Sequence, residues 1–347
     1  MKLNKITIAI AAGAVAVFIY VLLNVTPKQE AETVVDQTEV QPAVVYDKAG
    51  KFDKSFNEAV WNGVKRFTAD TGISVREVEP TNEAQVEQGL KKLAKRGNSP
   101  IVAVGFSSAN ALSAAAQAYP DTKFTLIDMV VPEANVQNVV FKEHEGSFLV
   151  GALAALKSET GTIGFVGGMD IPLISRFGCG YEQGAKHINA NITVLQKMTG
   201  STPAAWGNPS KGGEITRSQI EAGADVIFAA AGGTGMGVYQ AAADAGKLAI
   251  GVDSNQNHLQ PGTMLTSMVK RVGVAAYKSY ADAKDGTWSA GVTAMGLAEG
   301  GVDWALDKHN RSLVTADMET KVNAIKASII AGDIAVHDYM SDNTCNY

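Results

Sequence analysis

Short apolar runs alternate with amphipathic stretches along most of the chain. The segments 43–46 and 100–105 are short and apolar, which is typical of buried strands. In the segment 55–71, apolar side chains recur every three or four residues, which is typical of a helix. Further strands are expected at 73–78 and 123–127, and further helices at 83–96 and 109–118. Strands and helices that alternate at these lengths predict a parallel sheet with helices on both faces.

The same alternation continues through the second half of the chain. It predicts helices at 146–157, 180–188, 211–222 and 235–245, and strands at 162–166, 193–197, 225–230 and 249–252. Two similar α/β halves of roughly 100 residues each indicate two lobes rather than one large sheet. By analogy with two-lobed folds we assign residues 42–140 plus 264–290 to an N-terminal lobe, 141–263 plus 291–340 to a C-terminal lobe, and 341–347 to a tail, with several hinge crossings between the lobes.

The N-terminus has a different character. Lys2 and Lys5 precede an uncharged apolar run at 6–25, whose length of about 20 residues is what a helix needs to cross a bilayer. No small-residue cleavage site and no lipid-bearing cysteine follow the run, so we predict an uncleaved signal anchor rather than a removed signal. The flanking charges place the rest of the chain outside the cytoplasm, and the polar stretch at 26–41 is expected to be a flexible tether.

Composition agrees with an ordinary globular protein of two domains. The chain has 347 residues, 46% of them hydrophobic, and a formal net charge of −5. A mildly acidic chain has no basic footprint, so nucleic-acid binding is disfavoured.

The chain has two cysteines, Cys179 and Cys345, and their spacing is not that of a metal site. In an oxidising compartment they could form one disulfide that ties the C-terminal tail to the body. Two isolated buried thiols are the alternative, and the residues alone leave both open.

Polar residues that directly follow predicted strands are the first candidates for a binding site, because ligands of open α/β sheets bind beyond the carboxyl ends of the strands. Asp47, Asp128 and Asp253 each occupy such a position, and so does the glycine-rich turn at 232–237. Aspartates there also commonly cap turns, so position alone does not assign them to a ligand.

Enzyme chemistry has little support. The turn at 232–237 (GGTGMG) with Asp253 about 20 residues later suggests a dinucleotide-dependent enzyme, but the glycine spacing of that fingerprint is not met. The five histidines are scattered, and no metal-ligand spacing or nucleophile motif occurs. We therefore expect no catalytic residue, no metal and no cofactor.

The segment at 47–57, which ends in DKSFN, resembles the signature of the basic membrane protein (Bmp/Med-like) family, the nucleoside-binding receptors of ABC importers. Further blocks agree in order, namely those at 124–128, 145–155, 163–168, 223–235, 250–253 and 265–271. The resemblance implies a type I periplasmic-binding-protein fold, in which two Rossmann-like lobes are joined by a multi-strand hinge. The fold expected for the whole chain is thus this α/β architecture, preceded by an N-terminal transmembrane helix.

The resemblance also implies a ligand set. Phe56 and Phe228 would sandwich the base from opposite lobes, and Asp47, with Asn57 or Ser55, would bind the edge of the base. The groups that would hold the ribose hydroxyls are Asp128, Asp253, Lys270 and the backbone of Gly232 and Gly233. Two departures from the family pattern stand out: the usual lipid-bearing cysteine is missing, and Asn208 stands where an aspartate is common.

The implied function is a non-enzymatic receptor that captures a nucleoside, with a purine favoured, and presents it to a membrane permease with a cytoplasmic ATPase. A ligand-sensing surface protein on the same scaffold is one alternative. A dinucleotide-dependent enzyme is another, and an importer of some other small polar solute, such as a sugar, is a third.

Overall fold

The computed structural model describes residues 40–345. The predicted signal anchor at 6–25 and nearly all of the tether lie outside the described residues. Within 40–345, none of the helices combines the length and the apolar character that crossing a bilayer requires.

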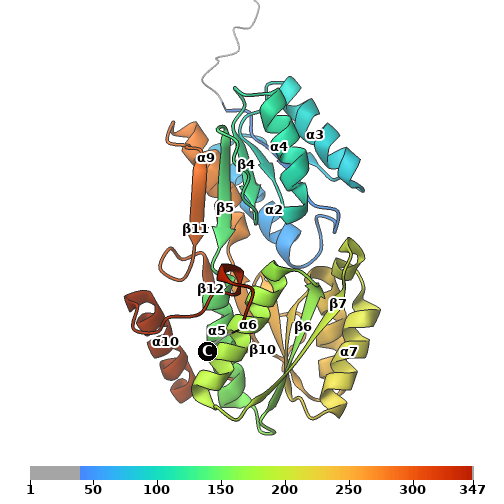
Figure 1. Ribbon diagram of the computed structural model, residues 1–347, viewed down its shortest axis with the longest axis vertical. Helices are drawn as coiled ribbons and strands as arrows, with labels where there is room; N and C mark the ends of the chain where they lie inside the picture. The colour runs from blue at the N-terminus through green and yellow to red at the C-terminus, as the bar shows by residue number, and fades with distance from the viewer. Residues whose placement is uncertain (1–39, 346–347) are drawn as a thin grey trace, which may run out of the picture. The chain divides into compact units, whose positions relative to one another are not determined.

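The first lobe is built on a six-stranded sheet whose strand pairs are parallel. The strand order is β11-β5-β4-β3-β1-β2. The strands are β1 (Ala43–Val45), β2 (Arg76–Val78), β3 (Ile101–Ala103), β4 (Phe124–Ile127), β5 (Val136–Phe141) and β11 (Gly291–Met295). One face is covered by α2 (Phe56–Thr71) and α9 (Val272–Lys284), the other by α3 (Glu83–Lys95) and α4 (Ala109–Ala118), as Figure 1 shows.

Neighbouring residues of β1 point to opposite faces of this sheet. Val44 packs in the cluster that contains Phe67 of α2, whereas Val45 packs in the cluster that contains Leu90 of α3. Because both faces are buried, every position of the strand is apolar, which explains the short continuous runs in the sequence.

The second lobe repeats the arrangement with the strand order β12-β10-β9-β8-β6-β7. Its strands are β6 (Thr162–Met169), β7 (Thr193–Gly200), β8 (Val226–Ala230), β9 (Leu248–Asp253), β10 (Met264–Lys270) and β12 (Val302–Trp304), of which β12 alone runs antiparallel to its neighbour. The covering helices are α5 (Glu143–Lys157), α6 (Pro172–Ile188) and α10 (Ala316–Ala331) on one face, and α7 (Pro209–Glu221) and α8 (Gly235–Asp244) on the other. Short 3₁₀ turns lie at η1 (Phe106–Ser108), η2 (Pro203–Trp206), η3 (Gly232–Thr234) and η4 (Tyr339–Ser341).

The expected two-sheet α/β fold is confirmed, but two late strands lie in the opposite lobe from the one predicted. The strand of segment 264–290 is β10, which pairs with β9 in the second sheet, and only the helix of that segment, α9, belongs to the first lobe. Conversely, β11 at the start of segment 291–340 pairs with β5 in the first sheet. The chain therefore crosses between the sheets three times: after β5, after β10 and after β11.

Glycines set the close approach of α5 and α6, the helix pair beneath the second sheet. A Cβ atom on Gly184 of α6 would collide with the carbonyl oxygen of Phe148 on α5, and one on Gly151 would collide with that of Tyr181. The two backbones touch because neither helix carries a side chain at the crossing point.

Replacing Gly184 by alanine is expected to lower the free energy of unfolding by about 1–3 kcal/mol, because the added methyl group forces the helices apart. Gly207→Ala is the matched control, since a Cβ there meets open space and the residue has an ordinary φ of −127°. Urea denaturation followed by circular dichroism measures both variants. Equal stability of the two would contradict the proposed close packing.

Candidate functional site

A cavity lies between the two lobes, at the carboxyl ends of strands from both sheets. Its empty volume is about 580 Å³, part of it open to solvent. From the first lobe it is lined by Asp47, Ala49, Asp53, Phe56, Gly105, Phe106 and Asp128. From the second lobe it is lined by Leu173, Ile174, Phe177, Trp206, Ala230, Ala231, Gly232, Val252, Asp253 and Lys270.

The structure brings together most of the residues predicted to bind ligand. Those that line the cavity are Asp47, Phe56, Asp128, Gly232, Asp253 and Lys270. The remaining four, Ser55, Asn57, Phe228 and Gly233, are not part of its lining.

The predicted ligand contact of Phe228 is wrong. The ring is fully buried in the core of the second lobe, where its centroid lies 5.5 Å from that of Phe165 and 5.3 Å from that of Tyr181. Phe228 sits in the middle of β8, and the residue that reaches the cavity from the same face of the strand is Ala230, two positions later. Phe228 belongs to a motif that continues to the end of β8, but the residue itself lies too far from that end to contact a ligand in the cavity.

Aromatic side chains that the sequence did not single out take the place of Phe228. Phe177 of α6 lines the cavity from the second lobe, opposite Phe56 of the first. Phe106 and Trp206 also line it from opposite lobes, with ring centroids 6.5 Å apart. Phe177 was missed because the predicted helix began at residue 180, whereas α6 begins at Pro172.

The DKSFN motif builds the start of α2. The carboxylate of Asp53 accepts hydrogen bonds from the backbone N–H groups of Ser55 (2.9 Å), Asn57 (2.9 Å) and Glu58 (3.2 Å), so it caps the helix that carries Phe56. Asn57 is buried, and its side-chain amide donates to Asp47 Oδ1 at 2.7 Å. Asn57 therefore holds Asp47 in place rather than contacting a ligand.

Lys270, the last residue of β10, is the centre of the site. Its ammonium group lies 2.6 Å from Asp128 Oδ2 and 2.9 Å from Glu143 Oε1. The same nitrogen lies 5.3 Å from the ring centroid of Phe56 and 5.6 Å from that of Phe177, within the range of cation–π contacts. Glu143, which the sequence analysis did not single out, is therefore a structural partner of the binding lysine.

Asp128 and Asp253 occupy equivalent places in the two lobes, at the ends of β4 and β9. Both have left-handed backbones, with φ of 74° and 62°, which is uncommon for residues other than glycine and clusters at functional sites. The second carboxylate oxygen of Asp128, Oδ1, is buried without a hydrogen-bond partner among the described residues. A buried acceptor of this kind is available to a ligand hydroxyl or amino group.

Burial shapes the charge of the site. It raises the pKa of Asp253 to about 7 and that of Asp128 to about 6, although Lys270 partly offsets the shift in both. Burial also acts against the charged form of Glu143, but Lys270 and Arg176 outweigh it and lower the pKa of that carboxyl group. Around Lys270 there is thus one firmly charged carboxylate, that of Glu143, and two, those of Asp128 and Asp253, whose charge depends on pH near neutrality.

Direct contacts join the lobes beside the cavity. The Ser55 hydroxyl donates to the Asp253 carboxylate, and the Ser254 hydroxyl donates to the backbone oxygen of Ser55 at 2.9 Å. Gln256 Nε2 donates to the backbone oxygen of Lys54 at 2.7 Å. Ser55 therefore connects the two lobes, which gives it a role other than the predicted ligand contact.

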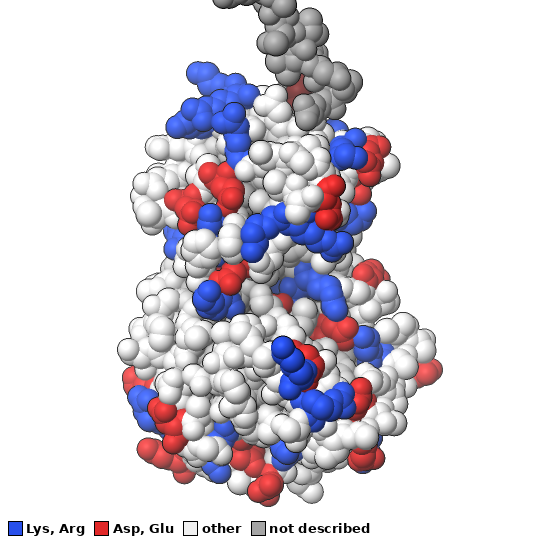
Figure 2. All heavy atoms as spheres, turned by 180° about the vertical axis from the view of Figure 1, so that it is seen from behind, with Lys and Arg blue, Asp and Glu red and all other residues white. Residues whose placement is uncertain are grey.

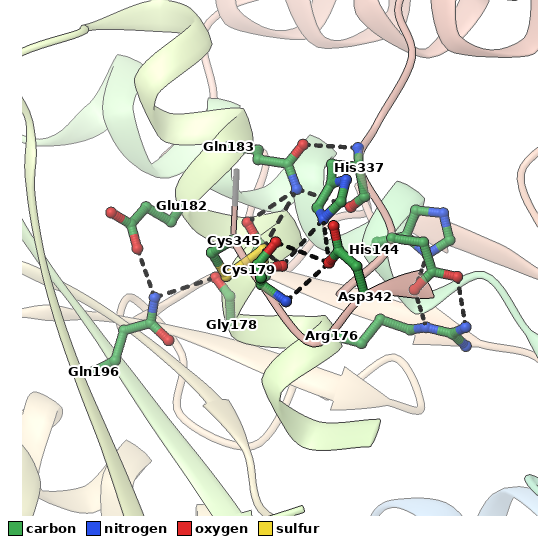
Figure 3. Close-up of a disulfide and its surroundings, with 12 residues drawn as sticks. His144, Arg176, Gly178, Cys179, Glu182, Gln183, Gln196, His337, Asp342 and Cys345 are labelled. Atoms are coloured by element: carbon green, nitrogen blue, oxygen red, sulfur yellow. Dashed lines mark hydrogen bonds and ion pairs between the residues drawn. A yellow bond between two sulfur atoms is a disulfide. The ribbon is translucent and has the colours of Figure 1, made fainter. Parts of the chain in front are cut away.

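The C-terminal tail is fixed to α6, as Figure 3 shows. A disulfide joins Cys179 to Cys345, and the side chain of Gln183 exchanges hydrogen bonds of 2.9 and 2.8 Å with the backbone of His337. Of the two alternatives left open by the sequence, the structure has the disulfide.

Arg176 of α6 connects the segment just before the tail to the end of β5, where the chain crosses between the lobes. Its guanidinium donates to both carboxylate oxygens of Asp338 at 2.7 Å, to Glu143 Oε2 at 2.9 Å and to the backbone oxygen of Phe141 at 2.8 Å. The tail, α6 and the end of β5 therefore share one network that reaches Lys270 through Glu143.

The outer surface carries charges of both signs. On the face shown in Figure 2, Lys and Arg side chains are interspersed with Asp and Glu over both lobes.

The family model described as "ABC transporter substrate-binding protein PnrA-like" (Bmp) matches residues 40–339 of the chain. The ABC transporter nucleoside-binding protein BmpA of Lactococcus lactis is 31% identical over 324 residues, which are 86% of this chain and 90% of the relative. An uncharacterized lipoprotein of Pyrococcus abyssi is 33% identical over 289 residues, 80% of this chain and 72% of the relative.

Solved structures agree with these sequence matches. An ABC transporter solute-binding protein from Aeropyrum pernix K1 superposes with a TM-score of 0.80 at 27% sequence identity, covering 88% of this chain and 95% of the other.

The Cys179–Cys345 disulfide closes a sequence separation of 166 residues, so its removal is expected to destabilise the fold by about 2–4 kcal/mol. Cys345→Ser compared with wild type by thermal denaturation, each with and without reductant, measures the effect. Reductant should lower the stability of the wild type toward that of the variant. Two free thiols in non-reduced peptide mass spectrometry would contradict the linkage.

The raised pKa of Asp253 predicts a stability that depends on pH. The folded protein holds this proton up to about pH 7, whereas the unfolded chain releases it near the ordinary value of 3.8. The stabilisation is therefore complete below about pH 4 and is lost as the pH rises through 7. Asp253→Asn does not titrate, so its Tm relative to wild type should increase by several degrees between pH 5 and pH 8.

Asp121→Asn, a change at an exposed position, is the control for this experiment. A difference in Tm between Asp253→Asn and wild type that stays constant with pH would show that the carboxyl group of Asp253 does not titrate in this range.

Proposed function

The chain belongs to the Bmp family of PnrA-like substrate-binding proteins of ABC transporters, and we propose that its ligand is a nucleoside held between the two lobes. A protein of this class delivers its ligand to a membrane permease that is driven by an ATPase. Family membership also favours a receptor over the dinucleotide-dependent enzyme that the glycine-rich turn suggested.

The observation that carries the proposal is the combination of side chains in the cavity. Phe56 and Phe177 contribute aromatic rings from opposite lobes, and the buried side chains of Asp128, Asp253 and Lys270 offer polar groups beside them. A nucleoside has flat apolar faces at one end and several hydroxyl groups at the other. Its two ends match the two kinds of wall.

The layout of the cavity supports one orientation of that ligand. A Cβ atom on Gly105 would lie 3.3 Å from Asp47 Oδ2 and 3.7 Å from Cε1 of Phe56, so Asp47 is close to one edge of the Phe56 ring. The ammonium group of Lys270 lies near the same ring and forms an ion pair with Asp128. We place the base on Phe56 with an edge toward Asp47, and the ribose toward Asp128, Asp253 and Lys270.

The energetics are adequate for a transport receptor. Stacking on an aromatic side chain contributes about 1–3 kcal/mol per base. A micromolar Kd requires about −8 kcal/mol, which two stacking contacts and several buried hydrogen bonds can supply. The only basic residue of the lining, Lys270, is already paired with Asp128 and Glu143, so a phosphate group would meet mainly carboxylates and nucleotides should bind poorly.

Two of the relatives support the proposal by their names. The relative from Lactococcus lactis is named as nucleoside-binding, and the one from Pyrococcus abyssi as a lipoprotein. We place the protein outside the cytoplasm and attached to the membrane, with the predicted signal anchor at 6–25 as its attachment.

A thermal-shift screen of nucleosides, free bases, sugars and nucleotides tests the proposed ligand directly. Nucleosides are expected to raise the Tm, and the other three classes to have little effect. A shift by sugars alone would reject the nucleoside.

Phe56→Ala and Phe177→Leu are expected to weaken nucleoside binding at least tenfold and severalfold, respectively, because each removes an aromatic face. Phe228→Leu is the control: it changes a ring in the core and should leave the Kd within about threefold of wild type, since a buried ring that contacts no ligand adds nothing to binding. Isothermal titration calorimetry measures all three variants. Unchanged affinity in both Phe56→Ala and Phe177→Leu would refute the site.

A further inference from the structure

We propose that the receptor accepts nucleosides that carry a substituent on the base, because the edge of the base faces a second hollow instead of a closed wall. This inference rests on the proposed nucleoside function and adds to it the class of nucleoside that can bind.

The second hollow adjoins the ligand cavity. It has an empty volume of about 1850 Å³, including space open to solvent. Both hollows are lined by Asp47, Ala49, Phe106 and Trp206. The four shared residues form the boundary between the two hollows.

The residues at this boundary belong to the base end of the ligand. Asp47 is the group placed beside the edge of the base, and it lines both hollows. Asp128, Asp253 and Lys270, which we assign to the ribose, line the inner cavity and are not among the residues of the outer hollow. A group attached to the base near Asp47 would therefore extend toward the outer hollow. Asp253 and Lys270 also line a third hollow, so the inference concerns substituents on the base alone.

The walls of the outer hollow suit an apolar group of variable shape. Part of the wall is formed by small side chains such as Ala84 and Ala109 and by two flexible ones, Met129 and Met169. The charged residues of the lining are Asp47, Lys48, Glu83 and Glu87; Lys48 pairs with Glu83 at 2.8 Å, and Glu87 pairs with Lys91 at 2.6 Å. Alkyl and benzyl groups on an exocyclic amine of the base are the chemical class that fits.

Calorimetric titration of the full chain with matched ligands tests the inference. Adenosine and guanosine are compared with N6-benzyladenosine and N2-benzylguanosine. We expect the base-benzylated ligands to bind within about threefold of the parent. A loss of at least 100-fold for the base-benzylated ligands would overturn the inference, because it would mean that the outer hollow is only an entrance.

A pair of variants locates the substituent. Ala84→Trp fills the outer hollow from an exposed position near the start of α3, and Ala316→Trp makes the same change at the exposed start of α10. Ala84→Trp should weaken the base-benzylated ligand at least tenfold and leave the parent nucleoside unchanged, while Ala316→Trp should affect neither. If Ala84→Trp leaves the benzylated ligand unaffected, the substituent does not occupy this hollow.

The outcomes also separate this inference from the proposed function. If neither adenosine nor guanosine binds, the purine-nucleoside form of the proposed function fails and the inference fails with it. If a parent nucleoside binds and its base-benzylated form does not, only the inference is rejected.

Discussion

The buried ammonium group of Lys270 is the interaction on which the site depends. A charge this far from water is tolerated only when opposite charges and hydrogen bonds replace its solvation. Asp128 supplies one partner from the first lobe, and Glu143 supplies another from the start of α5, directly after the crossing strand β5. Because Lys270 itself ends β10, the pairing joins the first lobe to two of the three crossings, and the geometry of the ligand cavity is tied to the geometry of the hinge.

The same electrostatic chain continues away from the cavity. Glu143 also accepts a hydrogen bond from Arg176, which holds Asp338, just before the tail, with two parallel bonds. Bidentate pairs of this kind fix orientation as well as distance. Arg176 is next to Phe177 in α6, so the tail and its disulfide hold the helix segment that places an aromatic wall of the cavity. A segment that looks like a terminal appendage is therefore part of the support of the binding site.

The sequence predicted the fold well and the site in part, and the difference has a physical cause. Positions after strands are readable, because parallel strands bring their carboxyl ends together, and this rule located Asp47, Asp128 and Asp253. Site residues that come from helices cannot be predicted from their position in this way. Glu143 and Phe177 lie in apolar or amphipathic stretches, in which nothing in the surrounding sequence marks a carboxylate or a ring as part of a site. Phe228 shows the converse error, since proximity to a recognisable motif does not say on which side of a strand end a residue lies. The lobe assignment of β10 and β11 failed because strand pairing between distant segments leaves no periodic signal.

The equivalence of the two lobes makes the position of Lys270 informative. The sheets have matching strand orders, β4 and β9 both end in an aspartate with a left-handed backbone, and β3 and β8 are both followed by a glycine and a 3₁₀ turn. A cavity built from two such halves would present nearly the same groups to the two sides of a ligand. The cation at the end of β10 removes that symmetry, since among the residues that line the cavity it is the only basic one. We therefore propose that this cation, with Asp128 beside it, orients the hydroxyl-rich end of the ligand.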